Sequence, residues 1–139
     1  MVKHGDYCML LNSSKTFKEA GKDIPKGTVL FKEGDKGEEM YLICSGEVKL
    51  TRKTASGEIV LAVLGFGEFF GETSVITNKP RTIGAEAITD CRLNIISKNV
   101  LETLVSSNPL VALSILKKMI FRIESAYDKI EELSIQRQG

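Results

Sequence analysis

The sequence is short of the residues that build metal centres and many catalytic sites. Its 139 residues include one histidine, three cysteines and no tryptophan. Cys8, Cys44 and Cys91 are far apart and form no Cys-x-x-Cys pair, so neither a zinc site nor a disulfide framework is expected. A metal held on a cluster of histidines cannot be built from His4 alone. The sequence therefore predicts no metal and no metal-dependent catalysis.

A strong net charge and long apolar runs are absent as well. The 19 lysines and arginines nearly balance the 18 aspartates and glutamates, so no overall field attracts nucleic acid or an anionic membrane. No apolar run approaches the roughly 18 residues that a transmembrane helix needs, and the N-terminus lacks the apolar stretch of a signal peptide. Scattered cysteines in odd number are typical of reduced thiols. We therefore expect a cytoplasmic protein, with no membrane and no nucleic acid among the partners of this chain alone.

What the sequence does contain is a series of short apolar runs separated by turns. Its length suits one domain, residues 1–139. From about residue 17 to about 96, the runs alternate with Gly, Asp, Asn and Pro, which predicts a mainly β fold: a sandwich, roll or barrel. The runs at 83–88 and 91–96 are expected to pair around the turn between them. Residues 1–16 show no clear period and are expected to form a short cap.

The last part of the chain, about residues 97–136, has a helical pattern. Ser97 can cap a first helix, and Asn108 followed by Pro109 is a strong start for a second, longer one. Apolar residues in the second helix recur every seven positions in two rows, which we call the heptad seam: Leu116, Ile123 and Ile130, with Met119, Ala126 and Leu133. This seam predicts a homodimer through residues about 109–133. The alternative is a long helix that lies on its own sheet.

A glycine-rich segment, residues 65–75, stands out in the middle of the chain. A dinucleotide-binding turn is one interpretation, but it needs a crossover helix, and the break at 78–80 comes too soon. A Walker loop is excluded because no Gly-Lys-Ser/Thr follows. The segment therefore calls for another kind of ligand.

An anion site agrees better with these residues. Gly71 permits close approach of the backbone, and the residues after it can form one helical turn whose N–H groups, those of Thr73 and Ser74 among them, face an anion. Arg81 can return across this turn and grip a phosphate with two charge-assisted hydrogen bonds. Glu72 would repel a phosphate, so it makes sense only beside a hydroxyl donor such as a sugar 2′-OH. A phosphate and a free ribose hydroxyl held close together describe a 3′,5′-cyclic nucleotide.

At this point the segment resembles a known family. Residues 71–82 look like the phosphate-binding cassette of the cyclic-nucleotide-binding domain family, and 31–35 and 45–48 match its glycine turns. The similarity runs from about residue 27 to about 105, and the long final helix resembles the dimer helix of the bacterial catabolite activator group.

The resemblance implies an eight-stranded antiparallel β-roll, jelly-roll-like and flanked by helices, in which Glu72 takes the ribose 2′-OH and Arg81 the cyclic phosphate. Thr82 can donate to the same phosphate. In the kinase branch of the family, a threonine at this position goes with cGMP, whereas hydroxyl residues in the bacterial branch coexist with cAMP. The activator-like helix favours cAMP over cGMP.

Two further candidates lie on the final helix. Arg122 falls where an arginine of the activator group can reach toward the glutamate, although it can equally be a solvated charge. Tyr127, with Ala126 before it, falls where polar residues of that group contact adenine. Tyr127 can stack on or hydrogen-bond the base, or it can fill the helix interface.

Each site residue also has a purely structural interpretation. Glu72 can be a carboxylate that satisfies the start of its own helix, and Arg81 an arginine on the surface after a proline. Gly34, Gly37 and Gly46 are expected to shape the turns of the roll and not the site.

The leading hypothesis is thus a cyclic-nucleotide sensor that catalyses nothing and signals through its final helix to a downstream protein partner. The alternative is a roll that has kept the fold but acts as an interaction or dimerisation module without ligand. An enzyme of the cupin type would need histidines that the chain lacks. The sequence leaves open whether the chain is a complete protein or part of a longer one.

Overall fold

The computed structural model describes residues 21–138, and the side chains of residues 21–136. The backbone forms two compact units, and the boundary between them falls at Lys98 and Asn99. The expected N-terminal cap, with His4 and Cys8, and the first expected residues of the roll, 17–20, lie outside the described residues.

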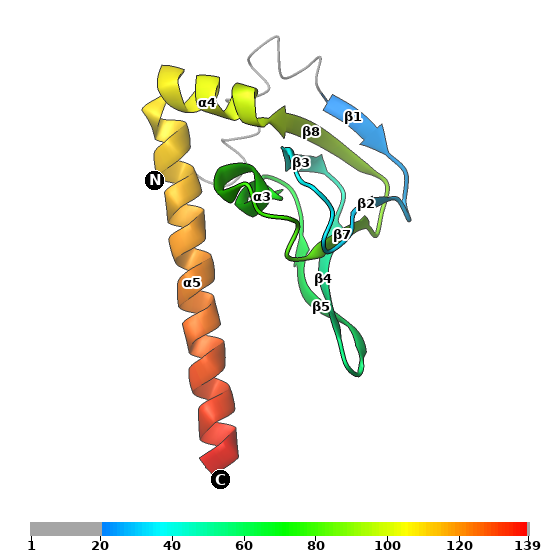
Figure 1. Ribbon diagram of the computed structural model, residues 1–139, viewed down its shortest axis with the longest axis vertical. Coiled ribbons are helices and arrows are strands. Elements are labelled where there is room, and N and C mark those ends of the chain that lie inside the picture. Colours follow the sequence, from blue (N-terminus) through cyan, green and yellow to red (C-terminus); the bar gives the residue numbers. More distant parts are fainter. Residues whose placement is uncertain (1–20, 139) are drawn as a thin grey trace. The chain divides into compact units, whose positions relative to one another are not determined.

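Eight strands lie in the described part of the first unit, and all their pairings are antiparallel. They are β1 (Gly21–Ile24), β2 (Val29–Phe31), β3 (Glu39–Ser45), β4 (Val48–Thr54), β5 (Gly57–Leu64), β6 (Phe69–Phe70), β7 (Gly84–Ala87) and β8 (Cys91–Ser97). One sheet has the order β1-β8-β3-β6 and the other the order β2-β7-β4-β5 (Figure 1). The expected eight-stranded antiparallel roll is confirmed.

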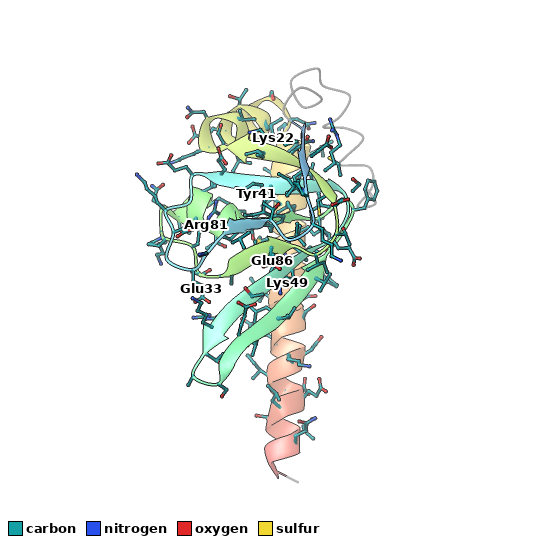
Figure 2. All side chains as sticks on the ribbon, turned by 90° about the vertical axis from the view of Figure 1, so that its right-hand side faces the viewer. Lys22, Glu33, Tyr41, Lys49, Arg81 and Glu86 are labelled. Atoms are coloured by element: carbon teal, nitrogen blue, oxygen red, sulfur yellow. The ribbon has the colours of Figure 1, made fainter. Side chains whose placement is uncertain are left out.

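The core of the roll is built by side chains that alternate along the strands. In β4, Val48 and Leu50 are buried while Lys49 between them is half-buried, which is the period of two expected for a strand with one covered face. The Lys49 ammonium instead lies near Glu58 and Glu86, at Nζ–Oε distances of 3.8 and 3.6 Å (Figure 2). Strands of both sheets contribute to one apolar cluster: Phe31, Tyr41, Ile43, Val48, Leu50, Leu64, Phe70, Ala85, Ala87, Cys91 and Leu93. This cluster packs the two sheets into one body.

The expected hairpin between residues 83–88 and 91–96 is wrong. Strands β7 and β8 do form there, but β7 pairs with β2 and β4, whereas β8 pairs with β1 and β3. Thr89 and Asp90 therefore carry the chain from one sheet to the other. An apolar run predicts a strand, but it does not say which strand will lie beside it.

The C-terminal part of the chain is helical, with α4 (Lys98–Ser107) followed by α5 (Pro109–Gln138). Asn108 caps α5 as expected, since its Oδ1 accepts the backbone N–H of Leu110 at 3.2 Å. Within residues 21–138, no single helix has the length and apolar content to cross a bilayer. Only α4 and α5 taken together, across a bend of 113°, meet that test.

Helix α5 exposes much of its apolar surface in the single chain. In the heptad seam, Leu116, Ile123 and Ile130 are 57%, 50% and 61% exposed. Large apolar side chains that are exposed in this regular way mark a surface for association. The exposed seam is thus one apolar surface that a partner could cover.

Candidate functional site

Helix α3 (Glu72–Thr77) follows β6 directly and begins at a glycine in an unusual conformation. Gly71 is the residue before the helix, with φ of 81° in the left-handed region, where other residues are strained. A Cβ atom at Gly71 would also lie 2.9 Å from Nη1 of Arg81 and 3.3 Å from the carbonyl oxygen of Glu39. Conformation and space therefore both require a glycine here.

The chain leaves α3 by a second left-handed residue and returns to the same place. Asn78 has φ of 58°, and its N–H donates to the carbonyl of Ser74 at 3.0 Å. Arg81 is then held by the β2–β3 loop, residues 32–38. Its N–H donates to the carbonyl of Asp35, and its own carbonyl accepts from the N–H of Gly34, both at 2.8 Å. The backbone of Arg81 is thus clipped to that loop on both sides.

The side chain of Arg81 is buried, with 5% of its surface exposed. Its Nη1 donates to the carbonyl of Gly71 at 2.7 Å, and its Nη2 donates to the carbonyl of Glu39 at 2.5 Å. The Cζ atom lies 4.1 Å from the centroid of the Phe31 ring, a distance typical of a cation–π contact. The expectation that Arg81 could be a surface arginine is therefore wrong.

Burial and neighbouring groups shift the pKa of the Arg81 guanidinium in opposite directions. Burial lowers the pKa of the guanidinium, while Tyr41, Glu39, Glu72 and Asp35 raise it. A guanidinium starts from so high a pKa that it stays protonated at neutral pH. Burial raises the pKa of the Tyr41 hydroxyl, so this group stays neutral. Figure 2 labels Tyr41 and Arg81 in the first unit.

The guanidinium keeps donors for another acceptor. Its two carbonyl bonds use two of the five N–H groups that any arginine carries. Among the described residues, the buried Nε has no hydrogen-bond partner. A buried cation with donors to spare favours a small anion as its ligand.

The structure brings four of the predicted site residues together. Gly71 contacts Arg81, and Glu72 is 6% exposed and interacts electrostatically with Arg81. Ser74 is buried, and its Cβ lies against Gly37, as the Arg81 guanidinium does. Thr73 is exposed. Because α3 has only six residues, its dipole is small and an anion site must depend on Arg81.

For the other three predicted residues, the structure describes only their exposure and the element on which they lie. Thr82 follows Arg81 and is exposed. Arg122 and Tyr127 lie on α5, in the second unit, where Arg122 is half-buried and Tyr127 is exposed. Their roles toward a ligand remain predictions.

A hollow of about 500 Å³ opens beside Arg81 on the side of the β2–β3 loop. Its lining includes the acidic residues Asp35, Glu38 and Glu39, with Lys36 as the second cation besides Arg81. Three acidic residues in the lining disfavour a phosphate in this hollow. An anion site at the Gly71–Glu72 end of the guanidinium stays a prediction.

Sequence reasoning missed several residues that contact Arg81, among them Phe31, Glu39 and Gly37. A Cβ atom at Gly37 would overlap Nε of Arg81 and would lie 2.5 Å from its Cζ and 2.7 Å from Cβ of Ser74. Gly37 thus lies against the guanidinium of Arg81 in addition to its place in the turn. The sequence holds no signal for this contact, because Gly37 and Arg81 meet only through the fold.

Comparisons with known proteins identify the family. The family model described as cyclic nucleotide-binding domain matches residues 22–108. The chain is 30% identical over 112 residues to the CRP-like cAMP-activated global transcriptional regulator of Mycobacterium tuberculosis, a match that covers 80% of this chain and 50% of that protein. It is 34% identical over 113 residues to the cyclic AMP receptor protein of Thermus thermophilus, with 81% of this chain and 52% of that protein covered.

A solved structure agrees with this result. The catabolite activator protein of Thermus thermophilus matches with a TM-score of 0.75 and 34% identity, over 82% of this chain and 54% of that one. The chain thus spans about half the length of these relatives. The chain belongs to the cyclic nucleotide-binding domain family, and the resemblance to its catabolite activator branch is confirmed.

Proposed function

We propose that this chain is a regulatory module that binds a 3′,5′-cyclic nucleotide and catalyses nothing. One observation carries the proposal: the guanidinium of Arg81 is buried against the Gly71 turn with donors to spare, and the Glu72 carboxylate is buried beside it. A cation and a carboxylate side by side suit a ligand that presents a phosphate and a hydroxyl together.

Each group in the site has a distinct task in this proposal. Arg81 pairs with the cyclic phosphate while it keeps its bonds to the carbonyls of Gly71 and Glu39. Glu72 accepts a hydrogen bond from the ribose 2′-OH. The backbone N–H groups of Thr73 and Ser74 complete the phosphate contacts. None of these groups attacks or cleaves a bond, and the ligand leaves unchanged.

Outside the cassette, the base is contacted from α5 in this proposal. Tyr127 meets the purine, and Arg122 reaches toward Glu72. Thr82 donates to the phosphate. The ligand is cAMP in preference to cGMP, which agrees with the names of two relatives, a cAMP-activated regulator and a cyclic AMP receptor protein.

The output of the module passes through α5. The exposed heptad seam supports a homodimer through residues about 109–133, because a second copy would cover its apolar side chains. A downstream protein partner then reads the state of the dimer. The reduced thiol of Cys91 agrees with a reducing, cytoplasmic location.

Calorimetric titration of the protein with cAMP, cGMP and 5′-AMP tests this proposal. We expect binding of both cyclic nucleotides, tighter for cAMP, and much weaker binding of 5′-AMP, whose phosphate is not held in a ring with the ribose. Absence of binding for both cyclic nucleotides would contradict the proposal. The chain would then act as an interaction module without ligand.

A further inference from the structure

We infer that Gly37 is a positioning residue for Arg81: the bare Cα of Gly37 forms a seat in which the guanidinium must lie in order to meet the anion. This inference rests on the proposed function, since it names a residue that sets the affinity of the same site. Gly37 does not touch the ligand, and its proposed effect on affinity passes through the position of Arg81.

The contact is closer than any side chain would permit. A Cβ atom at Gly37 would overlap Nε of Arg81, and its distance to Cζ would be 2.5 Å. The same atom would lie 2.7 Å from Cβ of Ser74 on α3. Gly37 therefore fills the narrow space where the β2–β3 loop, the guanidinium and α3 meet.

The guanidinium cannot move away from a Cβ atom at Gly37 without losing contacts of its own. Its Nη1 and Nη2 are held by the carbonyls of Gly71 and Glu39, and its Cζ lies over the Phe31 ring. The side chain is 95% buried by the same contacts, since only 5% of its surface is exposed. A shift of the guanidinium would therefore break its hydrogen bonds to these two carbonyls, and otherwise the loop itself would have to move.

Movement of the loop would also displace Arg81. The loop holds the backbone of Arg81 through the carbonyl of Asp35 and the N–H of Gly34, at 2.8 Å each. Whichever part moves, the N–H groups that face the anion turn away from it. Because a two-bond grip on phosphate depends on direction, misalignment should lower affinity even if the charge remains.

Backbone conformation is not the reason for a glycine at position 37. Gly37 is not among the glycines with positive φ, unlike Gly71, so alanine fits its backbone without strain. Gly65 offers a matched control. It also lacks a positive φ, and the only atom near its added Cβ is the carbonyl oxygen of Gly46 at 4.0 Å.

The test compares Gly37→Ala with Gly65→Ala by cAMP titration and by NMR of the arginine side chains. The Nε–Hε signal of Arg81, assigned by its loss in Arg81→Lys, reports the seat without ligand because the Phe31 ring shifts it. We expect Gly37→Ala to weaken cAMP binding on the order of tenfold or more and to move this signal. Gly65→Ala should change neither.

Two results would overturn the inference: wild-type affinity in Gly37→Ala, or weaker binding with the Arg81 signal unmoved. If Gly37→Ala does not fold, Gly37→Ala combined with Ser74→Gly removes the overlap with Ser74 and keeps the one with Arg81. It should still bind cAMP more weakly than Ser74→Gly alone, and equal affinity would refute the seat. A wild type that binds no cyclic nucleotide defeats the proposed function, whereas the ligand-free signal still tests the contact.

Discussion

The cassette around Arg81 buries a charged side chain, whereas helix α5 exposes apolar ones. Arg81 is a charged residue that lies 5% exposed, and bonds within its own unit hold it. Helix α5 is apolar along its seam, yet Ile123 is 50% exposed. The described contacts of Arg81 thus lie within one chain, whereas the seam leaves apolar side chains exposed. In the proposed function, a single chain binds the cyclic nucleotide, and the dimer formed through α5 transmits the signal.

The largest effect that separates the two regions should come from the heptad seam. Ile123→Glu places a carboxylate in the seam of each copy, and burying an unpaired polar group costs about 1–3 kcal/mol. With one such cost from each copy, the dimer dissociation constant should rise on the order of 100-fold, as measured by sedimentation. Affinity for cAMP at the cassette should change much less.

Ser125→Glu is the matched control, because it adds the same charge to α5 away from the seam. It should leave the dimer intact. A wild type that is already monomeric at tens of micromolar would refute the interface.

The next largest effect should come from the cassette itself. Arg81→Ala removes the one buried cation of the site, and losing such a charge pair costs about 2–5 kcal/mol. Binding of cAMP should weaken by at least about thirtyfold in calorimetry, with the dimer unaffected. Arg52→Ala removes an exposed arginine of the same unit and should bind as the wild type does. An unchanged affinity in a folded Arg81→Ala variant would end the assignment.

Glu72 should account for a smaller and more selective part of the affinity. A hydrogen bond to a charged group contributes about 1.5–3 kcal/mol, so 2′-deoxy-cAMP should bind the wild type about tenfold to a hundredfold more weakly than cAMP. In Glu72→Ala this gap should shrink, whereas in Glu47→Ala, an exposed carboxylate, it should remain. If the wild type does not distinguish the two ligands, Glu72 has another role.

The mainly β region and the helical end were predictable from local patterns, whereas the eight-stranded roll came from the family resemblance. The turn residues and the alternation in β4 mark strands, and Asn108 with Pro109 marks the start of α5, because these are local preferences of the chain. The neighbours of β7 and β8 were not predictable in this way. Pairing is decided by which apolar faces meet in the core, and that depends on the whole roll.

The candidate site was likewise predictable only where its residues are close in sequence. Gly71, Glu72 and Arg81 were found because they are close in sequence and chemically matched. The seat of Arg81 was not found, since Nη2 donates to a carbonyl 42 residues away and Gly37 meets the guanidinium only through the fold. A contact made by a backbone carbonyl, or by the absence of a side chain at a glycine, cannot be recognised from the residue types in a sequence.

The smallest effect, and the one that decides the purine, concerns Thr82. This residue is exposed beside Arg81, so its hydroxyl is free to reach a bound phosphate. One neutral hydrogen bond contributes about 1 kcal/mol, so Thr82→Ala should weaken cAMP and cGMP by the same factor of about fivefold if the hydroxyl meets only the phosphate. If the hydroxyl also accepts from the guanine 2-amino group, cGMP should lose much more than cAMP. Paired calorimetric titrations of the wild type and Thr82→Ala separate the two cases. A wild type that binds cGMP more tightly, together with a selective loss of cGMP affinity in Thr82→Ala, would show that Thr82 recognises guanine. It would also contradict the proposed preference for cAMP.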